Sequence, residues 1–251
     1  MLEMNAAFFA VGGAAALFAG VSKGGFGSGA AFASSAILAL FLPPGLALGI
    51  MLPLLMMIDL ATLRPYWKTW NWPVTRTLLL GAVPGILLGG ALYRLAEPDL
   101  IRFLIGAIAL VFVSWQVAQR TGLIRPVSRR LPPAAGVGAG VVAGFTSFVS
   151  HAGGPPVAVY LLSQGLSKTG YQGTTVLVFL AINICKFIPY AFLGLFTFET
   201  AMADLALAPF ALFGTWLGVK AHHLVSERLF FSITYVMLAL TGLKLIWEAL
   251  T

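Results

Sequence analysis

The residues best suited to chemistry lie in two polar interruptions of a chain that is 59% hydrophobic. The first is a glycine-rich stretch at 20–29 that contains one charged residue, Lys23. An ammonium group at membrane depth is energetically costly, so it normally faces a cavity or a partner, and amides of a glycine-rich break add donors for an oxyanion. We predict that this stretch binds an anion through Ser22, Lys23, Gly24, Gly25 and Ser28. The alternative is a lysine that extends to the membrane surface from a shallower break.

The second interruption runs from 150 to 156 and reads Ser-His-Ala-Gly-Gly-Pro-Pro. Proline suits the first turn of a helix, so this stretch predicts a short helix that starts at Pro155 with the positive end of its dipole directed into the protein. His151 could donate a hydrogen bond to an anion there, or it could bind a backbone carbonyl, and both readings stay open. The predicted binding residues of this break are Ser150, His151, Gly153 and Gly154.

Four further polar residues lie within or at the end of apolar segments, namely Asp59, Arg64, Asn183 and Lys186. Lys186 follows Asn183 by about one helical turn, and we include both in the predicted substrate-binding set. A carboxylate within a membrane either forms an ion pair or carries a proton. We expect Asp59 to form a structural ion pair with Arg64 or Lys186, and a proton-coupling role remains the alternative.

The two halves of the chain are related by an internal repeat. A shift of 124 positions places Ala19-Gly20 on Ala143-Gly144, Gly29 on Gly153, Asp59 on Asn183, and Pro65-Tyr66 on Pro189-Tyr190. Each copy therefore opens with an interrupted apolar segment, which is typical of two-repeat transporters whose site lies at the interruptions. The predicted organisation is a first repeat at 1–118, a basic linker at 119–133 and a second repeat at 134–251, which together form one transport domain.

Composition restricts the fold class to an all-α polytopic membrane protein. Charged residues make up only 9% of the chain, and the mean hydropathy is +0.95. Nearly all of the chain consists of apolar runs close to the length of a membrane-spanning helix, without the alternation of a barrel strand. The single cysteine, Cys185, has no partner for a disulfide or a cysteine metal site. We expect no cofactor.

The apolar runs predict a broken or re-entrant helix pair and three transmembrane helices in each copy. The first copy comprises short runs at 6–21 and 28–42 and crossings at 46–66, 73–95 and 100–118. The second comprises a helix to 149, a short run to 164 and crossings at 174–196, 202–225 and 229–250. An odd number of full crossings makes the repeats inverted, whereas a continuous crossing through each break would make them parallel.

Charge in the connecting segments predicts the orientation. The linker contains four arginines and no acid, and basic connecting segments stay in the cytoplasm. Both termini are then outside. The net charge of +7 resides mostly in loops, so we do not expect nucleic-acid binding. Glycines spaced four apart predict close helix contacts, at Gly81/Gly85/Gly89, Gly136/Gly140/Gly144 and Gly214/Gly218.

The order of these motifs resembles the TauE/SafE sulfite exporter family, also called the four-toluene-sulfonate uptake family. The likeness covers about residues 8 to 248. It is carried by the glycine-rich break after Ala19-Gly20, the Leu-Pro-Pro that follows the second run, the Tyr-Trp-Lys...Asn-Trp connector, the Gly-Gly-Pro-Pro at 153–156 and the Gly-Leu-Ser that begins at 165. The chain departs from the family pattern in carrying Lys23, Asp59 and Arg64. The resemblance implies a multi-pass carrier in the inner (plasma) membrane that moves sulfite or organosulfonates, usually outward.

Three hypotheses for the function follow. The first is a secondary carrier of small anions that works by alternating access, surrounded by lipid and in an oligomeric state that the sequence leaves open. The second is a membrane-embedded enzyme that uses Ser150 and His151. The third is a carrier of cations or neutral solutes that recognises them through Asp59. The chain contains no His-Glu-x-x-His, phosphate-binding loop or Cys-x-x-Cys, so we expect no enzyme activity.

Overall fold

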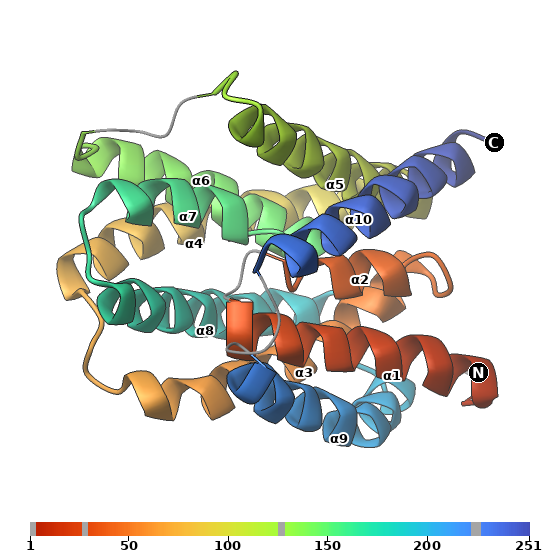
Figure 1. Ribbon diagram of the computed structural model, residues 1–251. Helices are drawn as coiled ribbons and strands as arrows, with labels where there is room; N and C mark the ends of the chain where they lie inside the picture. Colours follow the sequence, from red (N-terminus) through yellow and green to blue (C-terminus); the bar gives the residue numbers. More distant parts are fainter. Residues whose placement is uncertain (1–3, 27–29, 125–128, 222–226) are drawn as a thin grey trace.

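The computed structural model describes residues 4–26, 30–124, 129–221 and 227–251, and this part of the chain is helical without strands (Figure 1). The first half contains α1 (Ala6–Val21), the π-helix η1 (Ser22–Phe26), α2 (Ala33–Leu38), α3 (Pro44–Leu63), the 3-10 helix η2 (Arg64–Tyr66), α4 (Trp72–Leu95) and α5 (Pro98–Arg120). The second half contains α6 (Pro133–Ser150), α7 (Gly154–Ser163), α8 (Lys168–Phe192), α9 (Phe198–Ala221) and α10 (Glu227–Leu250).

Eight helices in the described ranges are long and apolar enough to cross a membrane. Their outward side chains include large exposed apolar groups such as Leu80, Leu87, Val111 and Leu240. Such groups are stable outside only where lipid covers them, because a soluble protein rarely exposes a contiguous apolar surface of this extent. The prediction of an all-α, multi-pass membrane protein is confirmed.

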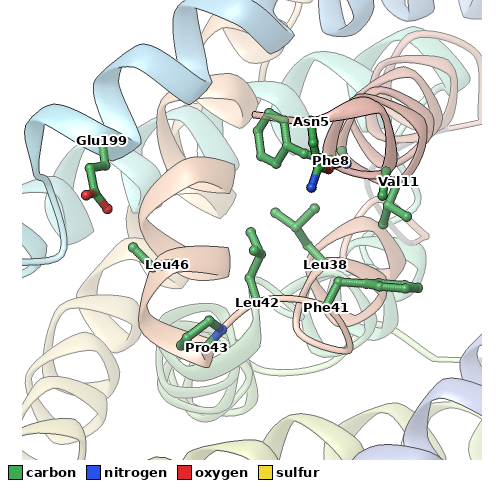
Figure 2. Close-up of a pocket in the computed structure, with 11 residues that line it drawn as sticks. Asn5, Phe8, Val11, Leu38, Phe41, Leu42, Pro43, Leu46 and Glu199 are labelled. Carbon is green, nitrogen blue, oxygen red and sulfur yellow. Dashed lines mark hydrogen bonds between the residues drawn. The ribbon is translucent and has the colours of Figure 1, made fainter. Parts of the chain in front are cut away.

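The first helix pair returns to the end of the molecule where it began. Asn5 before α1 and Leu42 after α2 line one cavity, together with Pro43 at the start of α3 (Figure 2). The first run ends in the glycine cluster as predicted: the regular helix α1 ends at Val21, and π-helical turns, which the sequence did not predict, follow it to Phe26. The second arm is shorter than predicted, since α2 spans only Ala33–Leu38.

The second helix pair, α6 and α7, forms a corresponding hairpin. At its open end, Arg130 Nε donates to Gln164 Oε1 at 3.1 Å, and the Leu131 amide donates to Ser163 Oγ at 3.4 Å. At its closed end, His151 adopts a left-handed conformation with φ of 58°. The short helix α7 then begins at Gly154 and carries proline in its first turn, as the sequence predicts.

The two hairpins open at opposite ends of the molecule. The start of α4 contacts the start of α8, where the Asn71 amide donates to Thr174 Oγ1 at 2.9 Å, and Gly136 of α6 lies against Thr77 of α4. Pro43, by contrast, lines one cavity together with Tyr93 near the end of α4 and with Thr197. Figure 1 shows both termini at its right-hand side and the start of α6 at its left-hand side. Inverted repeats would produce this arrangement, and the repeat relation with its boundaries stays a prediction.

Glycine faces bring helices of the two halves into close contact. A Cβ on Gly81 or Gly85 of α4 would overlap backbone carbonyls of α6, and one on Gly140 would overlap the backbone of α4. In the same way, Gly214 and Gly218 of α9 lie directly against the backbone of α1. The first helix of each half thus packs on the fourth helix of the other half, as expected for small residues four apart. Of these helices, α9 also contacts α3, and α4 also contacts α8.

Candidate functional site

The polar centre of the molecule is built around a buried ion pair between η1 and α3. Lys23 Nζ lies 2.5 Å from Asp59 Oδ1, and both side chains are almost fully buried. The amide of Asn183 on α8 donates to the other carboxylate oxygen, Asp59 Oδ2, at 2.7 Å. The ring of Phe179, one helical turn before Asn183, lies 5.7 Å from Lys23 Nζ. Both carboxylate oxygens of Asp59 therefore have a donor.

Asp59 and Asn183 correspond to each other in the predicted internal repeat. Their separation of 124 residues equals the shift that defines this predicted repeat. A direct hydrogen bond between two such residues places them where α3 and α8 meet. The polar centre therefore lies at the junction of the two halves.

A second buried cation, Lys186, lies one turn after Asn183 on α8. Its Nζ donates to the Ser147 carbonyl at 2.9 Å and lies 2.8 Å from His151 Nδ1. The other ring nitrogen of His151, Nε2, lies 3.3 Å from the Leu48 carbonyl on α3. A neutral imidazole with its proton on Nε2 satisfies both contacts, because Nδ1 then accepts from the lysine and Nε2 donates to the carbonyl.

The tips of the two hairpins touch beside these groups. Ser35 Oγ on α2 lies 2.9 Å from the Ser150 carbonyl at the end of α6 and 2.8 Å from the Phe32 carbonyl of its own turn, so its one O–H is shared between these two acceptors. Tyr190 Oη donates to the Phe148 carbonyl at 2.5 Å, and its ring lies 5.8 Å from Lys186 Nζ. The hairpin tips and the two long helices α3 and α8 therefore share one polar cluster. We call its charged and polar side chains the central cluster: Lys23, Asp59, His151, Asn183 and Lys186.

The central cluster contains five of the residues that the sequence singles out, and others lie at its edge. Ser22, Gly25, Ser150, Gly153 and Gly154 are buried, and Gly24 is partly buried. Gly24 and Gly25 lie against the backbone of α9, where an added Cβ would overlap the carbonyls of Thr215 and Gly218. These two glycines thus permit close packing of η1 on α9.

Other expectations for the site require correction. Asp59 pairs with Lys23, whereas Arg64 or Lys186 was predicted as its partner. Arg64 is exposed, because the chain tightens into η2 at this point and the side chain lies outside the buried core. Ser28 lies outside the described residues.

Sequence reasoning also missed three groups that hold the central cluster. They are the hydroxyl of Ser35 and the backbone carbonyls of Leu48 and Ser147. Ser34-Ser35 is a polar pair within an apolar run, which is the one signal that could have drawn attention to Ser35. The carbonyls carry no sequence signal, because every residue has one.

The central cluster contains more basic than acidic side chains. Its members include two lysines and one aspartate, which in their ordinary charge states give an excess of positive charge, and every described residue that bonds to Lys186 is neutral. An uncompensated charge in a low-dielectric interior is energetically costly and normally binds a partner. The described residues contain no group of His, Cys, Asp or Glu suited to a metal ion. The arrangement is therefore suited to bind an anion.

Two cavities lie on opposite sides of the central cluster. One, of about 450 Å³, lies at the start of α1 and is lined by Phe8, Leu38 and Leu46 among others (Figure 2). The other, of about 290 Å³, lies beyond the cluster and is lined by Gly24, Thr62 and other residues. Gly12 on α1 lines the first cavity and Gly24 on η1 lines the second, so the cavities are separated by about 18 Å of helix.

Comparison with known families assigns the chain. A family model described as sulfite exporter TauE/SafE matches residues 12–245, which is nearly the whole sequence. The chain belongs to the sulfite exporter TauE/SafE family. Membership in this family of transporters implies a multi-pass membrane transporter of sulfite-type anions and agrees with the expectation of no enzyme activity. No curated protein and no solved structure matches the chain.

Proposed function

We propose that this chain is a secondary transporter that exports small sulfur-containing anions, sulfite or organosulfonates, across the inner (plasma) membrane by alternating access. The observation that carries the proposal is the charge of the central cluster, in which two buried lysines face one buried aspartate. A sulfonate or sulfite group presents three oxygens, each of which accepts hydrogen bonds from ammonium groups. The substrate site is then formed by Lys23 and Lys186.

Alternating access requires a path from the cluster to either side. Gly24 directly follows Lys23 and lines the inner cavity, defined as the one at Gly24 and Thr62. Leu38 lies about one turn beyond Ser35 and lines the outer cavity, defined as the one shown in Figure 2. Movement of a few side chains would connect either cavity to the central cluster. Rocking of one repeat against the other would open the two cavities in turn.

The charges at the two ends support an outward direction. The end that holds the inner cavity carries exposed basic residues, including Arg64, Lys68 and Lys168. Basic segments stay in the cytoplasm, so this end faces inward. Lys168 lines the inner cavity and would raise the occupancy of an anion there, whereas Glu199 lines the outer cavity and would favour release of an anion from it.

The membrane potential is a sufficient source of energy for export. An anion that leaves a cell with a negative interior gains about 2.3 kcal/mol per charge for each 100 mV. The sequence contains no phosphate-binding loop that would couple transport to ATP. We therefore expect flux to follow the potential and the substrate gradient.

The competing hypotheses find less support in the geometry. A cation carrier would need the carboxylate of Asp59, but Lys23 and Asn183 occupy both of its oxygens. An enzyme would need Ser150 to bond to His151, but the Ser150 hydroxyl donates to the Thr146 carbonyl and the His151 ring contacts Lys186 and Leu48. Neither arrangement provides a free functional group of the required type.

The test is flux of labelled sulfite and methanesulfonate from proteoliposomes that contain the full chain. We expect flux of at least one of these anions, driven by an imposed potential, and its loss in Lys186→Met. The control is Lys244→Met, which removes a lysine from an exposed pair on α10. Absence of anion flux in the unsubstituted protein, or flux that Lys186→Met leaves unchanged, would contradict the proposal.

A further inference from the structure

The charge of the substrate follows from the charges around it. Among the described residues, the buried ionic side chains are Lys23, Asp59 and Lys186. His151 is neutral, because a protonated ring would direct a second N–H at the Lys186 ammonium group. Asp204 on α9 is only partly buried, and one of its carboxylate oxygens has no hydrogen-bond partner in the described chain. With Lys23, Lys186 and Asp59 in their ordinary charge states, the cluster thus has one positive charge in excess.

The lysines also leave donors for one oxyanion. Lys186 Nζ directs two of its three N–H groups at Ser147 and His151. Lys23 Nζ makes one hydrogen bond to a described residue, to Asp59. Three N–H groups of the two ammoniums remain for a ligand. This number fits one sulfonate or hydrogen sulfite group, whose oxygens would accept them.

We propose that the central cluster selects substrates with a single negative charge, organosulfonates and hydrogen sulfite, and discriminates against the doubly charged sulfite and sulfate ions. The proposal rests on the proposed function and specifies its substrate class. A monoanion brings the total charge of the cluster to zero, whereas a dianion leaves an uncompensated negative charge in the membrane interior. Such a charge is costly unless a further partner neutralises it.

Methanesulfonate, sulfate and sulfite distinguish the effect of the substrate's charge from the effect of its shape. Methanesulfonate carries one charge and sulfate two throughout the neutral pH range, and both are tetrahedral at sulfur. Sulfite converts from hydrogen sulfite to the dianion as pH rises through neutrality. We therefore expect methanesulfonate to be transported at least about tenfold faster than sulfate, given the cost of a buried uncompensated charge. Sulfite flux should decrease relative to methanesulfonate flux as pH rises.

Ratios of flux between the anions distinguish titration of the substrate from titration of the protein. The titratable groups that face Lys186 are Lys23 from η1, Asp59 from α3, His151 from the α6–α7 break and Tyr190 from α8. A titration of these groups that changed the charge of the cluster would also change the ratio of sulfate to methanesulfonate flux, although neither of those anions changes its own charge near neutral pH. A sulfite-to-methanesulfonate ratio that falls with rising pH while the sulfate-to-methanesulfonate ratio stays constant therefore reports on the substrate.

A variant in which the charge of the central cluster is altered provides an independent test of charge selectivity. Asp59→Asn raises the charge of the cluster to two, so we expect the ratio of sulfate to methanesulfonate flux to rise at least about tenfold. The matched control is Asp99→Asn, which removes an exposed carboxylate from the first turn of α5. If Asp59→Asn does not fold, the pH dependence of the unsubstituted protein still tests the proposal.

The outcomes are distinguishable. Equal sulfate and methanesulfonate flux, or a sulfite-to-methanesulfonate ratio that does not change with pH, would overturn the charge proposal and leave anion transport intact. Absence of flux for all three anions would overturn the proposed function itself, and the charge proposal with it. Methanesulfonate flux without sulfate flux, together with a pH-dependent sulfite ratio, supports both.

Discussion

Removal of Lys23 should destabilise the protein more than removal of both members of its ion pair. Lys23→Met leaves the carboxylate of Asp59 buried with one neutral donor, Asn183, and without its ammonium partner at 2.5 Å. Breaking a buried pair in this way costs about 3–5 kcal/mol. For a chain of this size, the melting temperature falls by about 2–4 °C per kcal/mol, so we expect a decrease of about 6–20 °C.

The double variant Lys23→Met/Asp59→Asn should recover much of this loss, because it removes both charges and keeps an acceptor for the Asn183 amide. The assay is thermal unfolding in one detergent for the unsubstituted protein, both single variants and the double variant. Lys244→Met is the control, since its exposed pair contributes about 0–1 kcal/mol. A Lys23→Met protein as stable as the control would refute the reasoning, as would a double variant that loses the sum of the two single losses.

Three further changes test other parts of the structure. Gly85→Ala should lower the free energy of unfolding by about 1–3 kcal/mol, because the added Cβ overlaps the α6 backbone. Gly138→Ala, whose Cβ meets open space, should be neutral or slightly stabilising, and equal effects of the two substitutions would contradict the close contact of α4 and α6. Ser35→Ala removes the hydrogen bond between the hairpin tips and should slow anion flux. The control is Ser34→Ala, which should leave flux unchanged because the Ser34 hydroxyl bonds to the nearby Ala31 carbonyl. Unchanged flux in Ser35→Ala would show that the contact between the tips is dispensable. Asp204→Leu should raise the melting temperature, because one buried carboxylate oxygen of Asp204 has no hydrogen-bond partner in the described chain, and such a group costs about 1–3 kcal/mol of stability. A loss of anion flux in this variant would instead assign Asp204 to the transport cycle.

The sequence predicted the features that depend on local composition. Apolar run lengths indicated the membrane-spanning helices, and the Gly-Gly-Pro-Pro at 153–156 indicated the start of α7. Glycines four apart indicated the faces on which α4 and α9 pack. Each of these signals lies within one segment, so no knowledge of the tertiary arrangement was needed.

The features that the sequence did not predict depend on contacts between distant segments. Glycine is a poor helix former, and the regular helix α1 does end at the start of the cluster at 20–29. The π-helical turns that follow to Phe26, and the contacts of Gly24 and Gly25 with the α9 backbone that accompany them, were not predicted. Likewise, the Lys23–Asp59 pair joins residues 36 positions apart, and nothing in either segment specifies its partner.

Ser35 and Arg64 illustrate the same limit in opposite directions. Ser35 lies in an apolar run and acquires its role from Ser150, which is 115 residues away. Arg64 lies close to Asp59 in sequence, but α3 gives way to η2 at that residue and the side chain is exposed. Proximity along the chain was therefore a poor guide to pairing at the end of a helix.

The most direct measurement of the central claim is an experimental density map of the protein with bromomethanesulfonate bound, in which the bromine identifies the ligand. We predict that the sulfonate oxygens lie within hydrogen-bonding distance of Nζ of both Lys23 and Lys186, between the inner and outer cavities. A ligand bound away from these two ammonium groups, or an absence of bound ligand at concentrations that saturate transport, would contradict the assignment of the central cluster as the substrate site.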